Sequence, residues 1–195
     1  MAPDSVLASP PAVCYAIDAA DRLSTVDDGW AAFAKANDGA HLLPPGIIGR
    51  SLWDAISDHT TRDLYREMVD RVRRGLGPIA LTFSCDAPGE RRRLHLRMVA
   101  GERGAVAFEV RMHTHARAPQ RLLDVHARRA GALVEMCSWC KRVVGPGKRW
   151  LPVEEAVEAL ALFTQASLPP LTHGICPDCY DLVLATLRES DPKDS

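Results

Sequence analysis

Cys137-Ser138-Trp139-Cys140 and Cys176-Pro177-Asp178-Cys179 are two Cys-x-x-Cys pairs around which the rest of the chain must be organised. The segment between them is longer than the roughly 15–20 residues of the commonest zinc patterns. A Cys-x-x-Cys turn directs two sulfurs at one point, so two turns supply four thiolates, the tetrahedral set that Zn²⁺ accepts at about 2.3 Å per bond. The sequence therefore predicts a zinc site whose ligands are Cys137, Cys140, Cys176 and Cys179.

The segment between the cysteine pairs has a pattern of its own. Gly145-Pro146-Gly147-Lys148 is typical of a turn. The run from Pro152 to about Gln165 favours a helix, with proline in its first turn and acidic residues where the helix dipole favours them. A second short helix is expected from Cys176 to about Leu187. These elements predict a small helical zinc-binding module over residues 137–188, followed by a flexible tail over residues 189–195.

Several interpretations of the four cysteines stay open. Four thiolates close a structural zinc site and leave no catalytic position. A redox dithiol is the alternative, because Lys141 and Arg142 would favour a thiolate, but the same cations suit a Zn(Cys)₄ centre with two negative charges. A third interpretation is that the cysteines hold an iron–sulfur cluster or no cofactor at all. His173, three residues before Cys176, is an alternative fourth ligand.

The composition is that of an ordinary globular protein, with 195 residues, 47% hydrophobic and 25% charged, and a net charge of −1. Such a chain has no electrostatic reason to bind nucleic acid or anionic lipid. No apolar run reaches the ~20 residues of a transmembrane helix, and residues 1–11 lack a secretory signal pattern. We expect a cytoplasmic protein, in which paired cysteines bind metal or act in redox chemistry rather than form structural disulfides.

Helices are expected in the N-terminal half of the chain. Asp27 or Asp28 can cap the first, because their carboxylates accept free backbone N–H groups. Ser51 caps a short second helix. A long amphipathic helix then runs from Thr60 or Thr61 to Arg74, with its apolar side chains on one face.

Strand patterns lie on both sides of these helices. Five runs have the alternation or composition of strands: residues 13–17, 22–26, 79–84, 93–98 and 106–112. The first two predict a hairpin and the last three an antiparallel meander. The predicted fold class is therefore α+β, a five-stranded antiparallel sheet with helices on one face over residues 12–115, after a flexible tail over residues 1–11.

This half of the chain also resembles a PAS sensor domain. The resemblance is carried by Val26-Asp27-Asp28-Gly29-Trp30-x-x-Phe33, Gly49-Arg50-Ser51-Leu52-Trp53-Asp54, Arg73-x-Gly75 and Phe83-x-Cys85-Asp86-x-Pro88. Family members usually have Asn near the position of Asp28, where this chain departs. The resemblance implies a cup between helices and sheet that binds a small apolar ligand or a partner. Five aromatic side chains would line that cup or, alternatively, form the core: Trp30, Phe33, Trp53, Phe83 and Phe108.

Heme and flavin are not expected in such a cup. His59, beside Asp58 and Thr60, fits a solvent-facing helix start better than a heme ligand. Cys85 lies on a strand, outside the Asn-Cys-Arg-Phe motif of flavin photochemistry. The run Arg91-Arg92-Arg93 is interpreted as a solvated strand face or as a patch for phosphate or an acidic partner.

The stretch over residues 116–136 has a helical spacing of three and four, at Leu122, Val125, Arg129, Ala132 and Met136. It predicts a connecting helix. That helix would either pair in a homodimer or pack on its own sheet.

The cysteine stretch is similar to a small module at the ends of bacterial PAS-containing and two-component signalling proteins. Cys-Ser-Trp-Cys-Lys-Arg, a later Trp and His-Gly-Ile-Cys-Pro-x-Cys carry that similarity, which implies a signalling context without a reaction. The chain has no phosphate-binding Gly loop, Gly-x-Ser-x-Gly elbow or His-Glu-x-x-His motif. We therefore expect a non-enzymatic sensor or adaptor with a protein partner. The alternatives are a redox switch that releases zinc on oxidation and a dithiol oxidoreductase.

Overall fold

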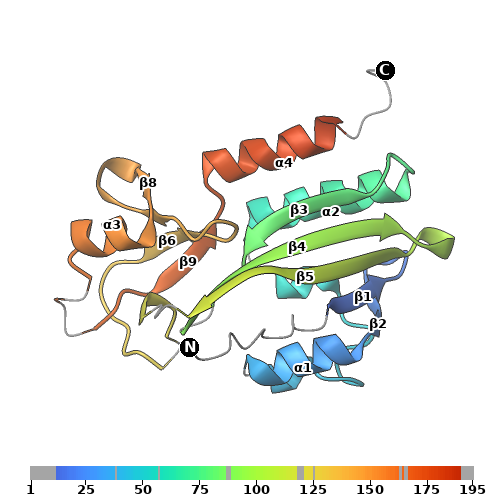
Figure 1. Cartoon of the computed structure of the whole chain (residues 1–195), viewed down its shortest axis with the longest axis horizontal. Coiled ribbons are helices and arrows are strands. Elements are labelled where there is room, and N and C mark those ends of the chain that lie inside the picture. The colour runs from blue at the N-terminus through green and yellow to red at the C-terminus, as the bar shows by residue number, and fades with distance from the viewer. Residues whose placement is uncertain are drawn as a thin grey trace, which may run out of the picture.

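A computed structural model describes residues 12–37, 39–56, 58–86, 89–117, 121–124, 126–162, 164 and 167–189 (Figure 1). The tail expected over residues 1–11 lies outside the described residues. Of the tail expected over residues 189–195, only Glu189 is described, and it ends a helix. None of the helices in the described part of the chain is both long and apolar enough to cross a membrane.

The N-terminal region contains a five-stranded antiparallel sheet. Its strands are β1 (Val13–Ile17), β2 (Leu23–Val26), β3 (Ile79–Ser84), β4 (Glu90–Ala100) and β5 (Val106–Arg117). They lie in the order β2-β1-β5-β4-β3, so that β1 and β5 meet in the middle and β3 forms one edge. The predicted α+β class, the first hairpin and the meander of the last three strands are confirmed.

Helix α1 (Asp28–Ala36) begins at Asp27, as the capping residues predict. The Asp27 carboxylate accepts the N–H of Trp30 at 2.8 Å and the N–H of Cys14 at 2.9 Å. The same side chain therefore starts the helix and ties it to β1. Gly29 lets the two segments approach, since a Cβ there would lie 2.2 Å from the carbonyl oxygen of Ala12.

Helix α2 (His59–Arg73) begins slightly earlier than expected. The cap is Asp58, whose carboxylate accepts the N–H of Thr61 at 2.6 Å. Before it, Ser51 caps a short 3₁₀ helix, Leu52–Ala55. The apolar stripe of α2 is buried against the sheet, at Leu64, Met68, Val69 and Val72.

Both helices pack on the same face of the sheet and enclose the core. Side chains from the strands and from α2 are at most 1% exposed, among them Ile17, Met68, Met98, Val106 and Phe108. The opposite face carries the alternate residues of each strand and is left uncovered by α1 and α2 (Figure 1). The helices thus cover one face, as predicted.

The connecting helix expected over residues 116–136 is wrong. Strand β5 continues to Arg117, residues 121–123 form one 3₁₀ turn, and β6 begins at Val134, with no α-helix among the described residues of this stretch. Gly131 adopts a left-handed φ of 94°, which a helix does not contain. The guanidinium of Arg129 donates to the carbonyls of Leu122, Asp124 and Pro169 at 2.7–2.9 Å. Arg129, one of the residues whose spacing predicted a helix, therefore holds a loop in place. The homodimer expected through that helix loses its basis.

The cysteine module, residues 134–189, is not purely helical, contrary to the prediction. It contains a four-stranded sheet in the order β8-β7-β6-β9, made of β6 (Val134–Cys137), β7 (Val143–Val144), β8 (Trp150–Leu151) and β9 (Leu171–Gly174). Helix α3 (Val153–Ala159) ends before the expected Gln165, which lies outside the described residues, and α4 (Pro177–Glu189) follows the second cysteine pair. A separate apolar cluster stabilises the first three strands and α3: Leu122, Met136, Val143, Leu151, Ala156 and Leu162.

The N-terminal sheet and the cysteine module also share one core. Residues of the module that are buried in the same cluster as the sheet and α2 are Cys137, Trp139, Cys176, Val183 and Leu187. The Trp139 ring meets Tyr65 of α2 edge-on, with ring centroids 6.1 Å apart. The N–H of Ser84, at the end of β3, donates to the carbonyl of Trp139 at 2.6 Å. The two regions are packed together rather than merely tethered.

Candidate metal centre

The four predicted cysteine ligands converge on one point. Cys137 ends β6 and Cys140 lies in the turn after it, while Cys176 precedes α4 and Cys179 lies in its first turn. Their Sγ atoms all lie within 4.8 Å of one another, and those of Cys140 and Cys176 are 3.6 Å apart. A tetrahedral ion with bonds of about 2.3 Å holds its sulfurs about 3.8 Å apart. This cluster, called the cysteine cluster below, can therefore hold a metal ion.

Backbone hydrogen bonds build the turn that carries the first pair. The N–H of Cys137 donates to the carbonyl of Arg142 at 2.8 Å, and the N–H of Lys141 donates to the carbonyl of Cys137 at 3.1 Å. Lys141 adopts a left-handed φ of 64°, which reverses the chain just after the second cysteine. The N–H groups of Trp139 and Cys176 both lie 3.4 Å from Cys137 Sγ. Such donors stabilise the thiolate, the form of cysteine that binds metal.

Strands β6 and β9 bring the two pairs together. They are parallel, with Cys137 opposite Gly174, and the N–H of Ser138 donates to the carbonyl of Gly174 at 2.8 Å. Because Gly174 stands two residues before Cys176, this register places the second pair beside the first. Sequence reasoning missed both strands, since four residues are too few to show a period.

The thiols of the cluster perturb one another. Hydrogen bonds from the Cys140 and Cys179 side chains lower the pKa of Cys137 far below its usual range. The same contact with Cys137 raises the pKa of Cys140 to about 11, and hydrogen bonds with Cys137 and Cys140 raise the pKa of Cys179. These contacts favour the thiolate at Cys137 and oppose it at Cys140 and Cys179. A metal ion that binds there must displace protons from the other thiols.

Two cations flank the cluster, as the sequence predicts. The ammonium of Lys141 donates to the carbonyl of Ser138 at 2.8 Å. Burial lowers the pKa of Lys141, and the charges of Cys85, Asp86 and the cluster cysteines oppose that shift. Lys141 thus lies between the cluster and the end of β3. Arg142 forms an ion pair with Asp178 in the first turn of α4, which ties the two cysteine pairs together on the surface.

His173, the alternative ligand, lies outside the cluster, which consists of the four cysteines. It is exposed on β9 and faces a polar hollow of about 310 Å³, which is also lined by Asp58, His59, Leu171 and Thr172. Loss of water from the side of the ring that faces the protein lowers the pKa of His173, and the charge of Lys141 adds to that effect while Asp58 opposes it. The four thiolates suffice for a closed site without this imidazole.

The aromatic side chains expected in the cup are packed against neighbours. Phe108 is 1% exposed and stacks on Tyr15 with ring centroids 4.5 Å apart. Trp30 meets Tyr15 edge-on at 5.3 Å, and its indole N–H donates to the carbonyl of Leu42 at 2.8 Å. These contacts fit a role in the core.

The other three aromatic residues also have partners. The indole N–H of Trp53 donates to the carboxylate of Asp21 at 2.8 Å. The guanidinium of Arg92 lies 5.3 Å above the centre of the Phe33 ring. Phe83 is half-buried against the shared core. These contacts favour the alternative that the five residues form the core over the alternative that they line a cup between helices and sheet. Phe108 also borders a hollow on the other face of the sheet.

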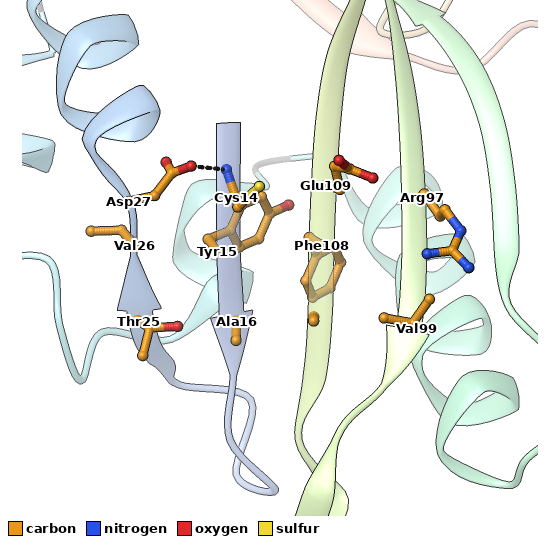
Figure 2. A pocket seen from close by; sticks show the side chains of 11 residues that line it. Cys14, Tyr15, Ala16, Thr25, Val26, Asp27, Arg97, Val99, Phe108 and Glu109 are labelled. Atoms are coloured by element: carbon orange, nitrogen blue, oxygen red, sulfur yellow. Dashed lines mark hydrogen bonds between the residues drawn. The ribbon is translucent and has the colours of Figure 1, made fainter. Parts of the chain in front are cut away.

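A larger hollow opens on the face of the sheet that α1 and α2 leave uncovered (Figure 2). It has a volume of about 430 Å³ and lies over neighbouring strands, between Thr25, Ala16, Ala107 and Val99, with Asp27, Arg97 and Glu109 at its rim. The amino-acid sequence alone does not reveal this hollow. Small residues at outward positions are the signal, but the strand order is needed to place them side by side.

The basic run on β4 is not a uniform solvated face. Arg92 is 7% exposed, and its guanidinium donates to the carbonyl of Cys85 at 2.7 Å and to the side-chain oxygen of Asn37 at 2.9 Å. Arg91 forms an ion pair with Glu154 of α3. The solvated interpretation is wrong for Arg92, which pins α1 to the end of β3.

Comparison with known proteins assigns no family: no family model matches the chain, and no curated protein matches it. Functional inference therefore depends on the cysteine cluster and on the way it is built into the fold.

Proposed function

We propose that the chain is an intracellular sensory or signal-transduction protein in which a PAS-like sheet region is coupled to a structural zinc module. The observation that carries this proposal is the convergence of four cysteine sulfurs within 4.8 Å, at the point where the module joins the core of the sheet. A site at that junction can link the state of the cysteines to the fold of the sheet.

Zinc is the proposed ion because all four donors are thiolates. Thiolate sets favour zinc among the common divalent ions, and four protein ligands leave no open position for a substrate. Cys137, Cys140, Cys176 and Cys179 would hold the ion, which would act as a cross-link between β6 and α4. Lys141 and Arg142 would offset the two negative charges of such a centre. No catalytic role follows, and we propose a non-enzymatic protein.

The PAS-like assignment is supported by the element order. A hairpin, then helices, then a three-stranded meander form one antiparallel sheet with the helices on one face. Because the expected cup residues are packed in the core, a protein partner suits this region better than a ligand in that cup. A cytoplasmic location fits six free cysteines.

The proposal is tested by the metal content of the purified, chelator-rinsed chain, measured together with its visible absorption spectrum. One zinc per chain and no visible band is the expected result. Four reactive thiols without metal would overturn the zinc site. A heme or flavin band would instead make the sheet region the cofactor site.

A redox switch is the second candidate. It is favoured by one observation: Cys140 and Cys179 are only half-buried, and Cys140 Sγ lies 3.6 Å from Cys176 Sγ. Peroxide would then form a disulfide and release zinc, which a zinc-sensitive dye records. Retention of the ion under peroxide would exclude this switch, and an insulin-reduction assay separates it from a dithiol oxidoreductase.

A further inference from the structure

Helix α4 connects the cysteine cluster to the edge of the N-terminal sheet. Its first turn carries Cys179, and Val183 and Leu187 follow at intervals of four residues, so the three side chains lie on one face. Val183 and Leu187 are 1% and 6% exposed. They are buried in the same core as Ile79 and Leu81 of β3. This face of α4 is therefore anchored at one end by two cluster cysteines and along its length by the sheet.

The strand beneath α4 is an edge strand. In the order β2-β1-β5-β4-β3, β3 is the last strand and is hydrogen-bonded to a neighbour, β4, on one side only. Helix α4 lies along β3 (Figure 1). The free side of an edge strand offers backbone groups for pairing with another chain. At its end, the N–H of Ser84 is taken by the carbonyl of Trp139, in the turn of the first cysteine pair. The module thus covers this edge with α4 and with the cysteine turn.

Helix α4 depends on its anchors. It has 13 residues, and isolated helices shorter than about 12–15 residues are marginal in water. Leu182 is 56% exposed on its outer side, so the apolar contacts come from one narrow stripe. The ion pair between Arg142 and Asp178 is solvent-exposed, and such pairs contribute little. The cysteine cluster is the strongest restraint on the first turn of the helix.

We propose that α4 is a metal-latched cover for β3, an inference that rests on the metal site proposed above. With the ion bound, the helix stays docked and the edge strand is covered. Without the ion, Cys176 and Cys179 are released, α4 leaves the sheet, and both β3 and the apolar surface beneath Val183 and Leu187 become accessible.

The release should be local. Strands β7 and β8 and helix α3 are stabilised by the separate cluster that includes Val143, Leu151 and Ala156, and no cysteine belongs to that cluster. Loss of the ion therefore removes the anchor of α4 while those elements keep their own core.

The test is hydrogen–deuterium exchange of the full chain, measured by mass spectrometry for the zinc-loaded protein and for the protein stripped by a chelator under reducing conditions. Peptides from α4 and β3 are expected to exchange roughly ten-fold faster or more after stripping. Peptides from α3 and from the central strands β1 and β5 should keep their rates. Unchanged α4 exchange, or an equal loss across the whole of residues 134–189, would overturn the latch.

A variant that keeps all four ligands separates docking from metal binding. The double substitution Val183→Asp and Leu187→Asp should expose β3 to exchange while one zinc per chain is retained. Leu182→Asp, on the exposed side of the same helix, is the matched control and should exchange like the unmodified chain. Protection of β3 in the double variant would contradict the proposal. If the purified chain holds no metal, the zinc site itself fails; if it holds zinc and α4 does not respond to stripping, only the latch fails.

Discussion

The N-terminal sheet and the cysteine module are stabilised by different means. Strand β5 has 12 residues and the sheet encloses side chains that are fully buried, such as Phe108 and Met98. In the module, β7 and β8 have two residues each and α3 has seven. Elements this short bury little apolar surface, and small units of this kind usually need a cross-link. The stability of the sheet should therefore depend on the volume of its core side chains, and the stability of the module should depend on its cysteines.

Loss of one cluster cysteine should have the largest effect on metal content and stability, and it tests the difference between the two regions most directly. Cys137→Ser is expected to remove nearly all bound metal and to release α4, because the binding energy of structural zinc, about 10–16 kcal/mol in zinc-finger peptides, is folding energy. Strands β7 and β8 and helix α3 should keep the structure that their separate apolar cluster stabilises. Metal analysis and circular dichroism check this. Cys14→Ser, which changes a cysteine outside the cluster, should leave both unchanged. Collapse of the entire fold in Cys137→Ser would show that the sheet cannot stand without the module.

Removal of a core aromatic residue should have the converse effect. Phe108→Ala is expected to lower the free energy of unfolding by about 3–5 kcal/mol, because it leaves a cavity between β5 and Tyr15. Chemical denaturation measures the change, and the metal content should stay the same. Leu133→Ala, at a residue 63% exposed, is the control and should change stability by less than about 0.5 kcal/mol. Loss of metal in Phe108→Ala would mean that the cysteine cluster depends on the whole sheet.

Acid should weaken the metal site more than the sheet. The contacts that raise the pKa of Cys140 to about 11 keep this thiol protonated at neutral pH, so the ion must displace its proton. Each displaced proton lowers the affinity about ten-fold per unit fall in pH, or about 1.4 kcal/mol. Competition titrations with a chelator at pH 6, 7 and 8 measure the slope. An affinity independent of pH would show that all four thiols are already ionised.

The contact between the two regions should show the smallest effect. Tyr65 and Trp139 pack edge-on across the boundary, and such pairs contribute about 0.5–1.5 kcal/mol beyond their buried area. A double-mutant cycle of Tyr65→Leu and Trp139→Leu should give a coupling of that size in the free energy of unfolding. A coupling near zero would mean that the two regions are stabilised independently despite their shared core.

The features predicted from the sequence are those that local chemistry determines. A Cys-x-x-Cys turn of four residues directs two sulfurs at one point, so the spacing of the cysteines predicts the cluster. Alternation in β3, β4 and β5 and the capping side chain of Asp27 are equally local. The cysteine cluster and the α+β sheet could therefore be inferred from the amino-acid sequence alone.

The features that were missed depend on contacts between distant segments. The spacing from Leu122 to Met136 fits a helix, but Arg129 donates to the carbonyl of Pro169, 40 residues away, and the spacing carries no information about that contact. Strand β9 pairs with β6, more than 30 residues earlier in the chain, and β6 pairs with β7 and β9. The sequence around Arg92 is typical of a surface cation, but in the fold the ends of α1 and β3 bury its guanidinium. The outward hollow on the sheet likewise requires knowledge of the strand order.

The parallel pairing of β6 with β9 has a consequence for biosynthesis. Parallel strands require a crossover, here the segment that holds β7, β8 and α3, so Cys137 and Cys140 leave the ribosome well before Cys176 and Cys179. Domains of nascent chains fold from the N-terminus onward, and the sheet can be complete while the first cysteine pair has no partner. During that interval the nascent chain carries a dithiol, Cys137 and Cys140, without the two cysteines that complete the cluster.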